Sequence, residues 1–99
     1  GYDPHWKDRL AMMEVSTTGF AEMVRFIKGL AEELCDGKIV ITLEGGYDLK
    51  ALATSVKATF DVLLGNASIE DPLGPPECRR TRPDITDLLR ALKETHQIT

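Results

Sequence analysis

The sequence predicts a domain of the α/β class built around a parallel sheet. Two apolar stretches have the spacing of amphipathic helices, and they flank residues 38–44, a run of high β-propensity. Because this run is apolar at consecutive rather than alternate positions, we expect it to be buried on both faces, with helices above and below. The composition suits a folded domain, since 42% of the 99 residues are hydrophobic and 28% are charged.

The first helix is expected to follow an irregular loop, residues 1–15. Ser16, Thr17 or Thr18 can cap its N-terminus, and Asp36-Gly37 is expected to end it. One face of the helix carries its apolar residues at helical spacing: Phe20, Met23, Val24, Ile27, Leu30, Ala31 and Leu34.

A second helix is expected after the turn at residues 45–48. Asp48 is its natural N-cap, and Gly65-Asn66 is expected to end it, so residues 16–65 form a helix-strand-helix unit. Residues 66–83 hold four of the five prolines and are expected to form a surface loop. Asp84 then caps a last helix, residues 84–97.

The sequence contains only one convincing strand. A strand buried on both faces needs partners for its backbone N–H and C=O groups. Either further strands lie outside this sequence, or two copies of the chain pair through the strand. The second possibility describes a noncatalytic α/β interaction module that dimerises through its single strand.

The charge of the chain argues against nucleic acid as a partner. The formal net charge is −4 and the isoelectric point is near 5.1. Arg79, Arg80 and Arg82 are the one basic cluster, expected to be a solvated loop, with an anionic partner as the alternative. Membrane contact is not expected, because no apolar run approaches about 18 residues. With no recognisable leader, a cytoplasmic location is the expectation.

Two places carry residues suited to chemistry. The turn Gly45-Gly46-Tyr47 follows the predicted strand, and ligands of open α/β sheets bind at the carboxyl ends of strands. The alternative is a plain strand-to-helix turn. Near the N-terminus, Asp3 and His5 are both of metal-ligand type, with a solvated loop as the alternative.

Three blocks of the sequence resemble, in order and spacing, blocks of the histone deacetylase family: residues 1–11, 16–20 and 43–48. Within that family, the three blocks are most similar to those of class II members and of bacterial acetoin-utilisation and acetylpolyamine deacetylases. The resemblance covers about residues 1–65. It implies the C-terminal part of a catalytic domain with the three-layer α/β/α, arginase/deacetylase-like fold. Pro4 and Arg9 depart from the family pattern, which affects the loop more than the ligand.

The resemblance implies a role for four residues in zinc-dependent hydrolysis of acetyl-lysine or an acetylpolyamine. Asp3 would be a zinc ligand, Tyr47 would hydrogen-bond the substrate carbonyl, and Gly45 and Gly46 would line the substrate channel. In the family the other zinc ligands and a histidine pair lie upstream. We therefore expect the 99 residues alone to be inactive and to need the missing N-terminal part of the domain. For His5, a plain hydrogen-bonded histidine is favoured over support of the metal loop.

Overall fold

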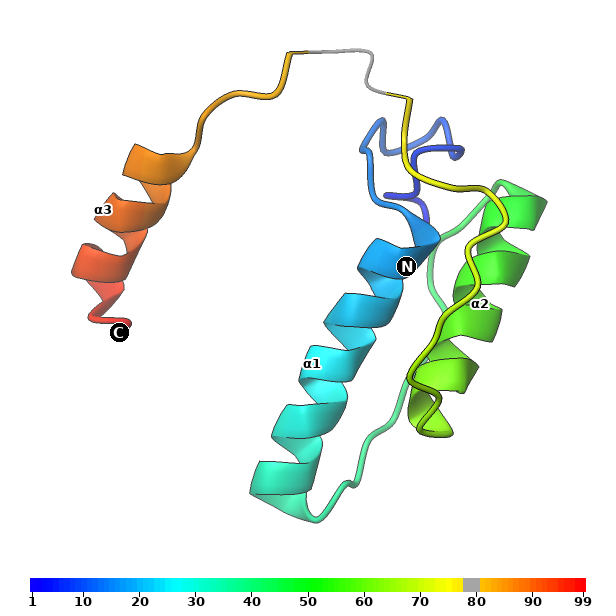
Figure 1. Cartoon of the computed structure of the whole chain (residues 1–99), viewed down its shortest axis with the longest axis horizontal. Coiled ribbons are helices and arrows are strands. Elements are labelled where there is room, and N and C mark those ends of the chain that lie inside the picture. Colours follow the sequence, from blue (N-terminus) through cyan, green and yellow to red (C-terminus); the bar gives the residue numbers. More distant parts are fainter. Residues whose placement is uncertain (78–80) are drawn as a thin grey trace.

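The computed structural model describes residues 1–77 and 81–99. Within these residues three helices follow one another: α1 (Thr17–Cys35), α2 (Leu49–Leu63) and α3 (Thr86–His96). In Figure 1, α1 and α2 lie side by side and run in the same direction, because the connecting segment returns the chain along their length. Helix α3 stands apart from this pair.

The prediction of an α/β parallel sheet is wrong. Across the described residues no strand forms, and the one β contact is an isolated parallel bridge between His5 and Val15. Residues 38–44 instead connect α1 to α2 and are open to solvent, with Val40 90% exposed rather than buried. The physical reason is that the described part of the chain offers this segment no neighbouring strand, so no ladder of backbone hydrogen bonds can form.

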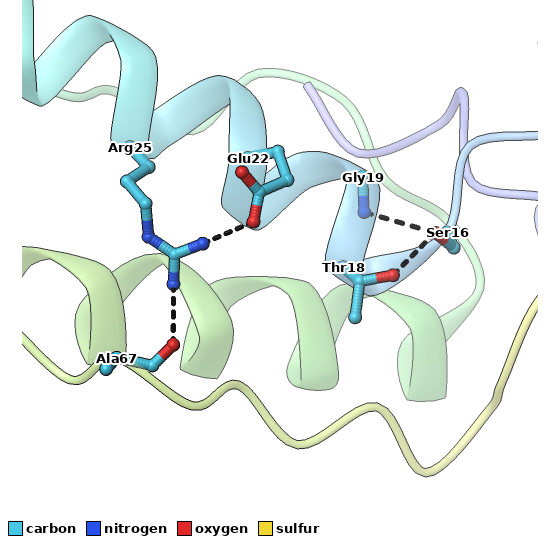
Figure 2. A network of polar contacts seen from close by, with 6 residues as sticks. All are labelled: Ser16, Thr18, Gly19, Glu22, Arg25 and Ala67. Carbon is cyan, nitrogen blue, oxygen red and sulfur yellow. Dashed lines mark hydrogen bonds and ion pairs between the residues drawn. The ribbon is translucent and has the colours of Figure 1, made fainter.

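Both ends of α1 are as the sequence predicts. The Ser16 side chain accepts a hydrogen bond from the Gly19 N–H at 3.1 Å, which satisfies one of the free donors of the first turn (Figure 2). At the other end Asp36 adopts a left-handed conformation with φ 55°, and the N–H of Gly37 donates to the Ala31 carbonyl. The predicted stop at Asp36-Gly37 is thus confirmed.

Helix α2 also begins and ends where expected, whereas α3 begins later. Asp48 caps α2 by accepting from the Ala51 N–H at 2.8 Å, and Gly65 follows its end with φ 87°. The last helix begins at Thr86 rather than at Asp84. The Asp84 carboxylate still accepts from the Thr86 N–H at 2.9 Å and from the Thr86 hydroxyl, so it organises the turn before the helix.

The core lies between α1 and α2 and is built from small side chains. Ala21 on α1 meets Ala58 and Val62 on α2, and Val24 and Ile69 pack against this cluster. Arg25 adds a polar link, because it pairs with Glu22 and donates to the Ala67 carbonyl in the loop after α2 (Figure 2).

The apolar stripe predicted for α1 is only half covered. Phe20 and Ala31 are buried, whereas Met23, Ile27, Leu30 and Leu34 remain exposed. On α3 every residue is exposed, including Leu88, Leu89 and Leu92. The Cys35 thiol is free and exposed, while Cys78, Arg79 and Arg80 lie outside the described residues. None of the three helices is long and apolar enough to cross a bilayer.

Candidate functional site

The Asp3 carboxylate lies directly against the backbone of Gly45. A Cβ added to Gly45 would overlap Asp3 Oδ1 and would stand 2.9 Å from Asp3 Cγ. Gly45 adopts no left-handed φ, so its backbone would accept a side chain and only the proximity of Asp3 excludes one. The carboxylate itself is half-buried and accepts no hydrogen bond from any described residue. Asp3 thus places at the surface of the glycine turn a carboxylate that has no hydrogen-bond donor among the described residues.

Gly46 packs against Tyr2, the residue that precedes Asp3 in the N-terminal loop. Its φ is 132°, a conformation that favours glycine, and an added Cβ would lie 3.3 Å from Tyr2 Cβ and 3.0 Å from Leu52 Cδ1. The Tyr2 N–H donates to the Gly45 carbonyl at 2.7 Å. The plain-turn interpretation of the two glycines is therefore incomplete, because residues 1–3 pack against both of them.

Tyr2 also anchors this loop to both packed helices. Its hydroxyl hydrogen-bonds the Thr59 hydroxyl of α2 at 2.6 Å. Its ring packs edge-on against Phe20 of α1, with 5.0 Å between the ring centroids. The two contacts fix the position of Asp3, the next residue, relative to the helix pair.

A second carboxylate, Asp8, binds the turn on the Tyr47 side. Asp8 Oδ2 accepts from the backbone N–H groups of Tyr47 at 2.6 Å and Asp48 at 2.9 Å, and Oδ1 accepts from Leu10 N–H at 2.9 Å. Asp8 is only 4% exposed. The backbone N–H groups of Leu10, Tyr47 and Asp48 stabilise the ionised form and lower the pKa of the Asp8 carboxyl below its ordinary value.

The side chain of Tyr47 projects into solvent. It is 64% exposed, and its hydroxyl makes no hydrogen bond with the described residues. An open hollow beside it is lined by Lys7, Asp8, Arg9, Leu10, Tyr47 and Asp48. The phenol is therefore available to a ligand.

His5 is a buried structural histidine. Its side chain is fully buried, and burial is the main reason that its pKa is lowered. The Lys7 N–H donates to Nδ1 at 3.1 Å, so the imidazole proton lies on Nε2, which donates to Thr17 Oγ1 at 3.2 Å. Thr17 in turn contacts the Thr54 hydroxyl at 3.1 Å. The hydrogen-bonded interpretation of His5 is confirmed.

The structure thus brings Asp3 and the turn of Gly45, Gly46 and Tyr47 together through the first eight residues. Among the residues described, no group of three or more His, Cys, Asp or Glu side chains is placed to hold a metal ion. Sequence reasoning missed Asp8, whose buried carboxylate contacts residues 39 and 40 positions away in the chain. No local signal in the sequence marks this contact, because the turn that Asp8 binds lies so far along the chain.

Comparison with known proteins gives a consistent family. Residues 1–63 match the model of the histone deacetylase domain. The chain is 36% identical to "Histone deacetylase 14, chloroplastic" of Arabidopsis thaliana over 97% of its length, and 35% identical to "Histone deacetylase 10, chloroplastic" of Oryza sativa subsp. japonica over 99%. It is also 40% identical to a "Probable deacetylase" of Archaeoglobus fulgidus over 50% of its length. No solved structure matches.

The chain spans only part of these relatives. It covers 23% of the length of each plant protein and 14% of the archaeal one. The plant relatives are chloroplastic by name, and the cytoplasmic location of this chain stays a prediction. The match to the domain model covers more than half of the chain, and it includes Asp3 and the turn of Tyr47. The predicted family is confirmed: this chain belongs to the histone deacetylase family.

Proposed function

We propose that the full-length protein is a zinc-dependent deacetylase that hydrolyses acetyl-lysine or a similar acetylated amine. In this proposal Asp3 is a metal ligand, Tyr47 is a catalytic residue, and Gly45 and Gly46 line the substrate channel. The observation that carries it is the placement of the free Asp3 carboxylate against the glycine turn that presents Tyr47. Membership of the family supplies the reaction class.

Asp3 suits the role of one zinc ligand. Carboxylate oxygens are among the side-chain groups that bind zinc, and this carboxylate has no hydrogen-bond donor among the described residues to compete with a metal. Bound zinc would lower the pKa of water and polarise the acetyl carbonyl. One carboxylate does not complete a site, so the remaining ligands must come from outside the described residues.

Tyr47 would act on the substrate oxygen. A phenol keeps its proton at neutral pH and donates a hydrogen bond, and donors that point at a developing oxyanion stabilise the transition state. The exposed hydroxyl of Tyr47 has no described partner to give up when it binds substrate. The neighbouring glycines would let an extended acyl chain approach the backbone closely, since neither has a side chain.

The rest of the deacetylase domain is the partner that this proposal requires. The exposed apolar residues of α1 and of residues 38–44 form surface that a deacetylase domain would cover: Met23, Ile27, Leu30, Leu34, Val40, Ile41 and Leu43. A second copy of the chain is the competing occupant. Light scattering of the 99-residue chain separates the two, because only the competing arrangement gives a stable dimer.

The experiment that tests the proposed function is Tyr47→Phe in the full-length protein. Removal of one oxyanion donor is expected to lower kcat by about 10²- to 10³-fold while zinc content stays unchanged. Tyr2→Phe makes the same chemical change at a hydroxyl that bonds Thr59 and helps to position Asp3, so it should lower Tm, whereas Tyr47→Phe should leave Tm unchanged. A Tyr47→Phe protein with the kcat of the wild type would contradict the proposal. The same assay on the 99 residues alone should give no turnover.

A further inference from the structure

Among the described residues, Asp8 is the only one that forms a hydrogen bond with the Tyr47 backbone. Its carboxylate is the hydrogen-bond partner of the Tyr47 N–H, and no other described residue bonds Tyr47. The segment before the turn gives no support of its own, because residues 39–44 make no ladder hydrogen bonds within the described chain. Within the described chain, the position of Tyr47 therefore depends on Asp8 and on the packing of the turn against Tyr2.

These bonds are not needed to start α2. Asp48 already caps that helix through its own side chain, with the Ala51 N–H at 2.8 Å. Asp8 instead binds the N–H groups of the two residues that precede the helix, and one of these is Tyr47. A buried carboxylate is costly unless donors surround it, and here the donors come from Leu10 and from the turn. The Asp8 carboxylate therefore serves to position this turn rather than to start α2.

The same short loop carries Asp3 at one end and Asp8 at the other. Asp3 lies against Gly45, the Tyr2 N–H bonds the Gly45 carbonyl, and Asp8 bonds Tyr47. The loop therefore contacts the turn on both sides. The distance between Asp3 and Tyr47 is set by the contacts of Asp3 and Asp8, two residues that lie five positions apart in the sequence.

We propose that Asp8 is a positioning residue that holds the Tyr47 backbone at a fixed distance from Asp3, so that the Tyr47 hydroxyl can hydrogen-bond the substrate oxygen. This inference rests on the proposed deacetylase function. An oxyanion donor acts only within about 2.7–3.1 Å of its target, and a misplacement of about 1 Å can cost about 10²-fold in rate. Asp8 acts through Tyr47 and does not touch the substrate.

The test is a double-mutant cycle in the full-length protein, with Asp8→Asn and Tyr47→Phe alone and combined. Asparagine keeps the shape of Asp8 but turns one acceptor oxygen into a donor amide. Asp8→Asn is expected to lower kcat by about 10- to 100-fold, with KM and zinc content near those of the wild type. In the Tyr47→Phe background the same change should cost less than about threefold, because the hydroxyl that Asp8 positions is already gone.

Asp71→Asn is the matched control. Asp71 also accepts backbone N–H groups, those of Thr18, Leu73 and Gly74, but it does not contact the Tyr47 turn. Its substitution should lower Tm without changing kcat. If Asp8→Asn does not yield folded protein, Asp8→Glu takes its place in the cycle, because it keeps the charge and shifts the carboxylate by one methylene.

Two results would overturn the inference. One is an Asp8 variant with the kcat of the wild type, and the other is an equal loss in both backgrounds, which would mean that Asp8 acts independently of Tyr47. Either result leaves the proposed function standing as long as Tyr47→Phe lowers kcat. If Tyr47→Phe is itself without effect, the proposed function fails, and the positioning role fails with it.

Discussion

Gly45→Ala should displace the Asp3 carboxylate while leaving the turn backbone intact. The new Cβ would stand 2.9 Å from Asp3 Cγ, whereas carbon atoms in contact are normally about 3.5–4.0 Å apart. Rotating the carboxylate would turn Oδ1 away but would leave Cγ too close, so the carboxylate must also retreat by about 0.6–1.1 Å. A shift of this size at a reacting centre can cost about 10²-fold in rate.

The assay measures kcat/KM, zinc content and Tm of the full-length protein. Gly29→Ala is the matched control, because Gly29 lies within α1 and a Cβ there would meet nothing within 4 Å. The control should keep wild-type activity and gain about 0.5–1 kcal/mol in free energy of unfolding, since alanine favours a helix interior over glycine.

For Gly45→Ala we expect reduced zinc content and a loss of kcat/KM of about 10- to 100-fold. Full zinc content together with full activity would refute the steric reasoning. Full zinc content with lower Tm and lower activity would also refute it, because the damage would then lie in the turn rather than at Asp3.

Two further predictions concern stability. Ser16→Ala removes the hydroxyl that accepts from the Gly19 N–H, and it should lower the free energy of unfolding by about 1 kcal/mol in denaturant titration. Thr18→Ala keeps that bond and should lower the free energy of unfolding by less. Equal losses would contradict the assignment of Ser16 as the cap. The lowered pKa of Asp8 should add stability that is present above its unfolded pKa of about 3.9 and is lost as pH falls through the lower folded value. Tm measured between pH 5 and pH 2 should show this loss in the wild type and a smaller one in Asp8→Asn; the same pH dependence in both would argue against it.

The helix boundaries could be predicted because their signals are local. Ser16 and Asp48 each bond an N–H three residues away, and Asp36 adopts the left-handed conformation next to a glycine. Such signals need only the residues within one turn of the helix end. The predicted start of α3 was two residues early, because Asp84 bonds Thr86 in a turn that precedes the helix.

Whether residues 38–44 form a strand could not be predicted from these residues alone. A run such as Ile39-Val40-Ile41 indicates a preference for extended, buried backbone, but a sheet exists only when a neighbouring strand supplies the hydrogen bonds. Contacts between distant residues were likewise out of reach. Asp8 meets Tyr47 and Tyr2 meets Thr59 across 39 and 57 positions, and no periodic pattern marks either pair.

The separation of α3 from the other two helices has a consequence for its helix-coil equilibrium. Helix α3 has 11 residues, and isolated helices shorter than about 12–15 residues are marginal in water because nucleation is costly. Asp87 in the first turn and Lys93 in the last complement the helix dipole, but each such charge contributes only about 0.3–1 kcal/mol. Since α3 makes no contact with α1 or α2, its melting should be gradual and uncoupled from theirs.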